Sequence, residues 1–151
     1  MVDIHSYKRP ESVLVVVYTR TGKVLLLQRA DDLEFWQSVT GSMRWGETAP
    51  IQAARRELGE ETGIIDANLA DLDVTHRYAI RPQWRHRYAP EETENLEHAF
   101  ALELPADIAI TLNPVEHAAY EWLAFEHAAA KVWSWTNREV IELVARGRKR
   151  G

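Results

Sequence analysis

A chain of 151 residues fits one domain, and its 46% hydrophobic and 27% charged residues are typical of a folded globular protein. We therefore expect a single domain over 1–151. The absence of cysteine excludes disulfides, thiolate zinc sites and cysteine nucleophiles. The formal charge of −5 argues against general nucleic-acid binding, and no apolar run suits a membrane span or signal peptide. A cytoplasmic location is the expectation, while the oligomeric state is not indicated.

The first part of the chain predicts β-structure. The segments 12–18 (SVLVVVY) and 23–29 (KVLLLQR) are rich in β-branched residues or leucine, and TRTG between them predicts a hairpin of buried strands. A third strand is expected over 36–42 (WQSVTGS). It leads into a helix, roughly 51–62, for which Gly63 suits the position after the last turn.

This helix carries an unusual acidic face. At 3.6 residues per turn, Glu57, Glu60 and Glu61 lie within an arc of about 100°. Such a face is usually just solvated. Here, however, the like charges repel one another, and those in the C-terminal half oppose the helix dipole. A hard divalent cation such as Mg²⁺ or Mn²⁺ would compensate, because it prefers carboxylate oxygens.

The second half of the chain mixes strands and helices without regular alternation. Further strands are expected over 71–80, 97–104 and 118–123, and a basic loop (RPQWRHRYAP) follows the first of them. Thr136 and Glu139 have capping-box spacing, which predicts the start of a final helix. This pattern favours an α+β sandwich with a mixed sheet between helices over a doubly wound fold.

The stretch 41–64 (GSMRWGETAPIQAARRELGEETGI) resembles the Nudix box, whose usual form is G-x5-E-x7-R-E-U-x-E-E-x-G-U with U aliphatic. Gly41 and Glu47 have the usual separation, and the second half matches in register from Arg56 onward. Eight residues instead of seven separate Glu47 from Arg56. An insertion inside the helix would rotate the later helical residues by about 100°. We therefore expect the extra residue around 48–51, before the first full turn.

The resemblance implies a Nudix-type α/β/α sandwich and metal-dependent hydrolysis of a diphosphate linkage. It implies that Glu57 and Glu61 are the principal metal ligands, that Glu60 supports them, and that the Gly41 carbonyl also reaches a metal. Arg56 is expected to orient the glutamates. Mg²⁺ is the expected metal, with Mn²⁺ as a substitute.

Stretches outside the box resemble the bacterial dihydroneopterin triphosphate pyrophosphohydrolases, also described as dATP pyrophosphohydrolases. They are YKRP (7–10), LLLQRADDLEFWQSVTGS (25–42), RHRYAP (85–90), EHAAYEWL (116–123) and WSWTNREVIE (133–142). That family removes pyrophosphate from 7,8-dihydroneopterin triphosphate in the folate pathway, using Mg²⁺. The resemblance implies that Glu116 is a further metal ligand and a candidate base. The implied substrate contacts are Lys8, Arg29, Thr40, Tyr78 and Ser134.

Several of these residues also have ordinary explanations. Lys8 and Arg29 are equally explicable as solvated surface cations, although an acidic metal site needs cations to receive the outer phosphates. Trp36, Trp133 and Trp135 could stack on a flat pterin or purine, but tryptophan is more often a core residue.

The leading hypothesis is an Mg²⁺-dependent pyrophosphohydrolase that converts 7,8-dihydroneopterin triphosphate to the monophosphate and pyrophosphate. On this hypothesis dATP and other nucleoside triphosphates are secondary substrates. One alternative is a hydrolase of canonical or oxidised nucleoside triphosphates, and another is a Nudix-fold module that binds nucleotide without turnover. The expected partner is a small-molecule triphosphate, with neither nucleic acid nor membrane.

Overall fold

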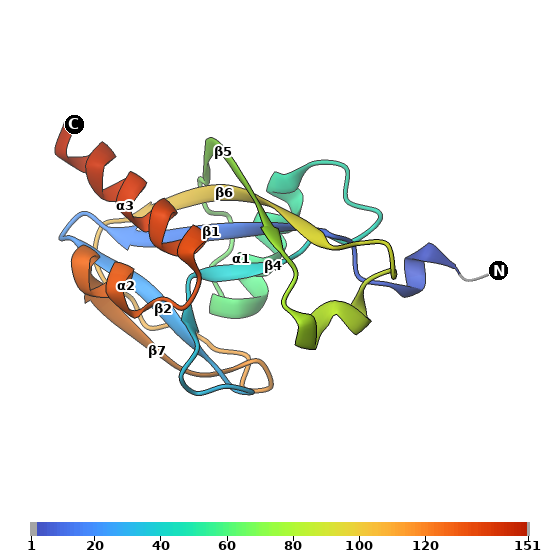
Figure 1. Ribbon diagram of the computed structural model, residues 1–151. Coiled ribbons are helices and arrows are strands. Elements are labelled where there is room, and N and C mark those ends of the chain that lie inside the picture. The colour runs from blue at the N-terminus through green and yellow to red at the C-terminus, as the bar shows by residue number, and fades with distance from the viewer. Residues whose placement is uncertain (1–2, 151) are drawn as a thin grey trace.

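The computed structural model describes residues 3–150, so the first two residues and the last residue of the expected domain lie outside it. A mixed seven-stranded sheet lies at the centre, with helices on both of its faces (Figure 1). The strands are β1 (Glu11–Thr19), β2 (Lys23–Arg29), β3 (Trp36–Gln37), β4 (Val39–Ser42), β5 (Ala70–Ala79), β6 (Glu94–Leu104) and β7 (His117–Ala124). The helices are α1 (Pro50–Thr62), α2 (Phe125–Lys131), α3 (Trp135–Arg150) and the short 3₁₀ turns η1 (Ile4–Ser6) and η2 (Pro82–Arg87). The expected α+β sandwich is confirmed.

Strand β1 organises the sheet. It pairs in parallel with β6 along its whole length, from Glu11 opposite Leu96 to Thr19 opposite Leu104. On its other edge β4 pairs with the first half of β1, while β2 meets β1 only near Tyr18. Strands β3 and β7 both pair with β2, and β5 pairs with β6. The central position of β1, covered on both faces, explains its continuous apolar sequence.

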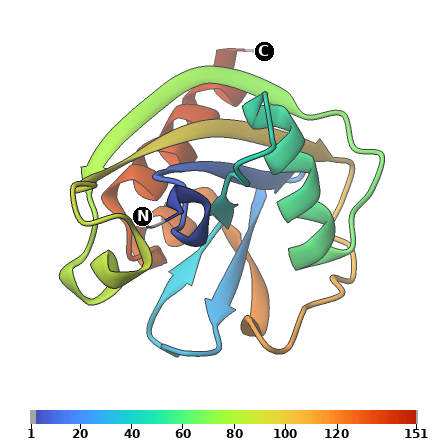
Figure 2. The ribbon, with the colours of Figure 1, turned by 90° about the vertical axis from the view of Figure 1, so that its right-hand side faces the viewer.

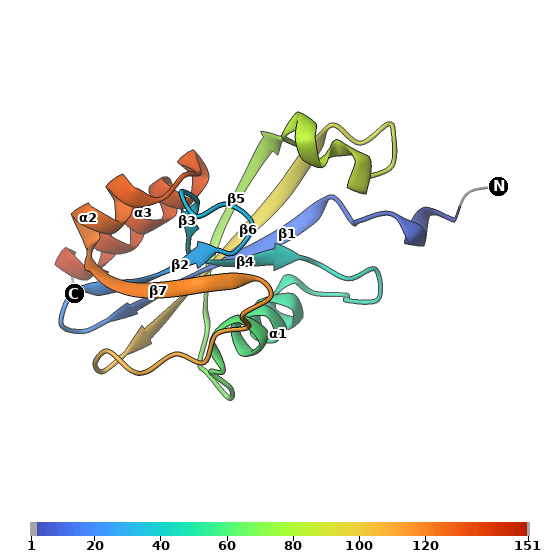
Figure 3. The same cartoon turned by 90° about the horizontal axis from the view of Figure 1, so that it is seen from below.

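The two faces of the sheet carry separate cores. Helix α1 lies over one face, and α2 and α3 lie over the other (Figures 2 and 3). Odd-numbered residues of β1, such as Val13 and Val15, pack against Leu58 and its neighbours on α1. Even-numbered residues, such as Leu14, pack against Ile141 of α3 and its neighbours. This alternation follows from the two-residue period of a strand. No helix within residues 3–150 is long and apolar enough to cross a membrane.

Helix α1 begins and ends as its sequence predicts. Pro50 occupies the first helical position, and the side-chain oxygen of Gln52 accepts hydrogen bonds from the backbone N–H groups of Thr48 and Ala49. Gly63 follows the last turn in the left-handed conformation, with φ of 80°. The helix runs without interruption from Pro50 to Thr62, so Arg56 and the three glutamates lie on one regular helix.

The predicted strand 36–42 is wrong in one respect, because Ser38 divides it into β3 and β4. The backbone N–H of Ser38 donates to Asn137 Oδ1 at 2.9 Å, and its hydroxyl accepts from Asn137 Nδ2 at 2.9 Å. The backbone N–H and the hydroxyl of Ser38 therefore form hydrogen bonds with a side chain of α3 and not with a neighbouring strand. The break lets β3 pair with β2 while β4 pairs with β1.

The predicted start of the last helix is also displaced. Helix α3 includes Thr136, which is buried and shares a hydrogen bond of 2.8 Å with the hydroxyl of Ser134. The Ser134 hydroxyl also accepts from the backbone N–H of Asn137 at 3.4 Å, as an N-cap side chain does. The capping position therefore belongs to Ser134. Helix α2, which packs against α3, was not predicted.

Candidate active site

A cavity of about 850 Å³ opens where the N-terminal stretch, β4, η2 and the start of α3 meet. Most of the predicted site residues line it: Lys8, Arg29, Thr40, Gly41, Glu57, Tyr78, Glu116 and Ser134. Glu60 and Glu61 are not among its lining residues. The structure thus brings together residues from almost the whole length of the chain.

Glu61 is the most deeply buried acid of the helix, with 1% of its surface exposed. Neither carboxylate oxygen has a hydrogen-bond partner among the described residues. Burial raises the pKa of Glu61 well above its usual range, and the neighbouring carboxylates of Glu57 and Glu116 raise it further. An unpaired buried carboxylate is costly unless a cation compensates it.

His117, at the start of β7, lies over Glu61, with 3.6 Å between Nε2 and Oε1. Burial and, to a smaller extent, the nearby Arg29 guanidinium together lower the pKa of His117 to about 4, with Asp31 opposing them. His117 is therefore neutral at neutral pH and does not balance the charge of Glu61. Sequence reasoning gave this histidine no role, because its contact with the helix depends on how β7 pairs with β2.

Glu57 lies next to the backbone of Gly41. A β-carbon at position 41 would collide with the Glu57 carboxylate, so only glycine allows this close approach. Arg56 Nη1 donates to Glu57 Oε1 at 2.7 Å. The carboxylates of Glu57 and Glu61 lie close together, and that of Glu61 has no hydrogen-bond partner in the described part of the chain. Together with the Gly41 backbone they form a donor set that suits a hard divalent cation.

Glu60 is more exposed than this pair and shares Arg56 Nη1 with Glu57. Its carboxylate is exposed and meets Arg44 at 3.2 Å and Arg56 at 3.4 Å. Glu116 is exposed on the cavity wall, just before β7. Within residues 3–150, no three acidic or histidine side chains already converge closely enough to enclose one ion. The structure therefore assembles Glu57 with Glu61 and places Glu116 and Glu60 further out.

Arg56 joins the loop before α1 (43–49) to the helix. Its Nε and Nη2 atoms donate to both oxygens of Glu47, at 3.0 and 2.9 Å. Nη2 also donates to the carbonyl of Ser42 at 3.0 Å. The same loop is fixed from the other side, since Arg9 donates to the carbonyls of Arg44 and Glu47 at 2.9 Å each.

Basic side chains line the cavity near the acidic residues. Burial lowers the pKa of Lys8, with Arg87 and Arg29 lowering it further and Glu57 opposing them. The guanidinium of Arg29 is fixed by two hydrogen bonds to Asp31, at 2.8 and 2.7 Å. The cavity therefore holds positive charge in defined positions, as the binding of an anionic ligand requires.

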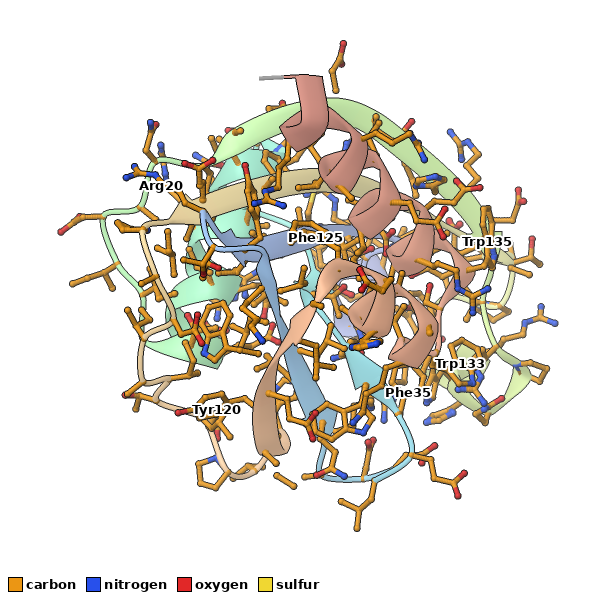
Figure 4. The ribbon with its side chains drawn as sticks, turned by 90° about the vertical axis from the view of Figure 1, so that its left-hand side faces the viewer. Arg20, Phe35, Tyr120, Phe125, Trp133 and Trp135 are labelled. Carbon is orange, nitrogen blue, oxygen red and sulfur yellow. The ribbon has the colours of Figure 1, made fainter. Side chains whose placement is uncertain are left out.

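Aromatic rings form a second part of the wall. Phe35 stacks on Trp133 with 4.9 Å between ring centroids (Figure 4). The guanidinium of Arg81 lies 4.1 Å from the centroid of Trp133 and 4.9 Å from that of Trp84. Trp36, considered for ligand stacking, is instead a core residue with 9% of its surface exposed. Phe35, Arg81 and Trp84 meet only through the tertiary fold, so local sequence spacing does not reveal the cluster.

The hydroxyl groups predicted to contact substrate have structural partners as well. Thr40 Oγ1 donates to the carbonyl of Val13 at 2.9 Å, which leaves its lone pairs available. The Tyr78 hydroxyl accepts from Asn95 Nδ2 at 3.0 Å, and burial raises its pKa. Each of these oxygens is held at a fixed position on the wall.

Comparison with known protein families gives a match to the NUDIX domain over residues 8–144. The chain belongs to the NUDIX domain family. Dihydroneopterin triphosphate diphosphatase of Escherichia coli strain K12 is 50% identical over 141 residues, which cover 90% of this chain and 92% of the relative. The Haemophilus influenzae protein of the same name is 40% identical, over 90% of this chain and 87% of its own length.

The fold of this NUDIX domain agrees with solved structures. That of the E. coli dihydroneopterin triphosphate pyrophosphohydrolase superposes with a TM-score of 0.85 at 48% identity, covering 91% of this chain and 95% of the other. An Ap4A hydrolase complex of Caenorhabditis elegans superposes with a TM-score of 0.73 at 19% identity, covering 93% of this chain and 98% of its own, and shares the fold. NUDIX hydrolases generally use divalent metal ions, which fits the paired carboxylates of α1.

Proposed function

We propose that this NUDIX enzyme hydrolyses 7,8-dihydroneopterin triphosphate to the monophosphate and pyrophosphate, with Mg²⁺ as its metal and Mn²⁺ as a substitute. The observation that carries the proposal is the buried, unpartnered carboxylate of Glu61 beside a cavity that also holds Lys8 and Arg29. The choice of substrate is supported by 50% identity to a relative of that name. We further propose a single domain over 1–151, located in the cytoplasm, acting on a small-molecule triphosphate instead of nucleic acid or membrane.

In this proposal Glu57 and Glu61 hold the metal, with Glu116, the Gly41 carbonyl and Glu60 in supporting positions. The bound ion would neutralise phosphate oxygens and orient or acidify the attacking water. No covalent nucleophile of the protein is needed.

The remaining roles fall to the chain's own side chains. Lys8 and Arg29 receive the outer phosphates, and the forked guanidinium suits two oxygens at once. Glu116 is exposed at the cavity wall, where it can accept a proton from water. Thr40, Tyr78 and Ser134 contact the substrate with hydroxyl groups that the fold holds in place.

Pyrophosphate release with Mg²⁺ tests the proposal, using dihydroneopterin triphosphate, dATP, dGTP and an oxidised dGTP as substrates. We expect the highest kcat/KM for the pterin. The variant Glu61→Gln should lose several orders of magnitude in rate, because a metal ion contributes several kcal/mol of charge stabilisation. Glu126→Gln, an exposed change on α2, should match the wild type.

Two results would overturn separate parts of the proposal. A clear preference for the oxidised purine would replace the pterin as substrate while leaving the metal site in place. Near-normal turnover by Glu61→Gln, with normal folding, would show that the metal ligands are assigned wrongly.

A further inference from the structure

Strand β6 presents two buried hydrogen-bond acceptors without partners at the inner wall of the cavity. Glu97 and Asn95 are 4% and 2% exposed, and both line the cavity. Glu97 Oε1 and Asn95 Oδ1 have no hydrogen-bond partner among the described residues. The two residues are two positions apart on a strand, so their side chains point to the same face of the sheet.

The neighbours of Asn95 fix its amide oxygen as an acceptor, and Glu97 is an acceptor in its ionised form. Asn95 Nδ2 donates to Ser12 Oγ at 2.7 Å and to the Tyr78 hydroxyl at 3.0 Å, so the orientation of the amide is set and its oxygen receives no donor from the described residues. Burial raises the pKa of Glu97, and the Thr136 hydroxyl and the nearby His76 only partly oppose this. A buried polar group without a partner lowers stability by about 1–3 kcal/mol, so nothing in the fold itself favours this arrangement.

An aromatic ring lies close to the same place. Trp135 is 52% exposed, lines the cavity and packs edge-on against His76, with 5.6 Å between ring centroids. His76 on β5 is paired with Glu97 on β6. Figure 4 shows Trp135 on the same side of the molecule as Trp133 and Phe35. This end of the cavity therefore combines unpaired acceptors with an accessible flat ring.

We propose that Glu97 selects the heterocycle of the substrate by accepting hydrogen bonds from the donor edge of a 2-amino-4-oxopyrimidine ring. That ring presents a ring N–H and an exocyclic NH₂ side by side, and a carboxylate can accept from both. Thymine presents one N–H between two carbonyl oxygens, which a carboxylate would repel. The inference rests on the proposed function, since it explains how that enzyme would recognise a pterin.

The first test compares kcat/KM for dihydroneopterin triphosphate with kcat/KM for dTTP. Glu97→Gln keeps the shape of the side chain but turns one acceptor into a donor. We expect it to lower the ratio roughly tenfold to a hundredfold, mainly through KM for the pterin, because hydrogen bonds to charged groups have this strength. The matched control is Glu94→Gln, an exposed change on the same strand, which should leave the ratio unchanged.

A second test requires no hydrolysis. Binding of 7,8-dihydroneopterin, which has no phosphate, is measured by fluorescence titration in metal-free buffer. Wild type and Glu94→Gln should bind alike, and Glu97→Gln should bind at least tenfold more weakly. On the wild-type protein, an analogue with a carbonyl in place of the 2-amino group should also bind at least tenfold more weakly, which covers the case that the variant does not fold.

The outcomes separate the inference from the function on which it rests. If wild type prefers the pterin and Glu97→Gln keeps the same ratio, the role of Glu97 is overturned and the function stands. If the pterin triphosphate is not hydrolysed but dihydroneopterin binding depends on Glu97 and on the 2-amino group, the recognition stands and the function fails. Equal losses for both substrates together with a lower Tm would mean that Glu97 is structural, and would also overturn the inference.

Discussion

At the scale of single residues, the site contains a buried carboxylate, Glu61, that does not stabilise the fold. Glu61 is fully buried and has no hydrogen-bond partner within residues 3–150, and the adjacent His117 is neutral at neutral pH. Replacement by glutamine removes the buried ionisable group and keeps the shape. We therefore expect Glu61→Gln to raise Tm in metal-free buffer by a few degrees while it abolishes metal-dependent pyrophosphate release. Calorimetry checks the first effect, and a lower Tm would show that the carboxylate stabilises the fold.

Gly41 gives a second prediction at this scale. A methyl group at this position meets the Glu57 carboxylate, so Gly41→Ala must displace either the strand or the acid. We expect a loss of about 1–3 kcal/mol in the free energy of unfolding and at least a hundredfold lower kcat. Gly46→Ala is the matched control, because a methyl group there meets no described atom within 4 Å. Equal effects of both substitutions would contradict the close-approach argument.

At the scale of elements, Arg56 joins the loop before α1 to the helix. It donates to both oxygens of Glu47 and to Glu57, with 16% of its own side chain exposed. We expect Arg56→Ala to lower the free energy of unfolding by roughly 2 kcal/mol, because it leaves partly buried carboxylates unpaired. Urea unfolding measures this, with Arg55→Ala, an exposed neighbour on the same helix, as the control. Similar losses in the two variants would argue against the network.

The elements also show what a sequence can predict. Helix α1 is predicted closely, because its proline, glycine and apolar stripe are local signals. The break at Ser38 is not, because it depends on Asn137 of α3, far along the chain. The same distinction applies to the site. The acidic helix is visible as a motif, whereas Asn95 and Glu97 read as ordinary polar residues until the strand's inward face is known.

At the scale of the whole molecule, Glu11 is among the side chains that link the parallel strands β1 and β6 at the centre of the sheet. Glu11 on β1 meets His98 on β6 at 2.6 Å and Arg9 at 2.8 Å. Burial alone would raise the pKa of Glu11, but the hydrogen bonds from His98 and Arg9 outweigh it, and the net pKa is lowered. Its folded pKa thus lies below the unfolded value of 4.5, so the stability it contributes is present above pH 4.5 and is lost as the pH falls.

We therefore expect Glu11→Gln to be less stable than wild type at pH 7, and the difference to shrink as the pH falls from 4.5 toward the folded pKa. Urea unfolding of both proteins across this range measures the difference. Glu94→Gln, which is exposed, controls for the general loss of an acidic group. A difference that stays constant down to the acid-unfolding limit would contradict the assignment.

The parallel pairing of β1 with β6 has a consequence for how the molecule is made. β6 follows β1 only after α1 and β5, and His117, which covers Glu61, comes later still. Contacts between such distant segments form late, because the intervening chain must first be closed into a loop. On the ribosome, the acidic helix therefore emerges with its carboxylates in water, and Glu61 becomes buried only when nearly the whole chain has been synthesised.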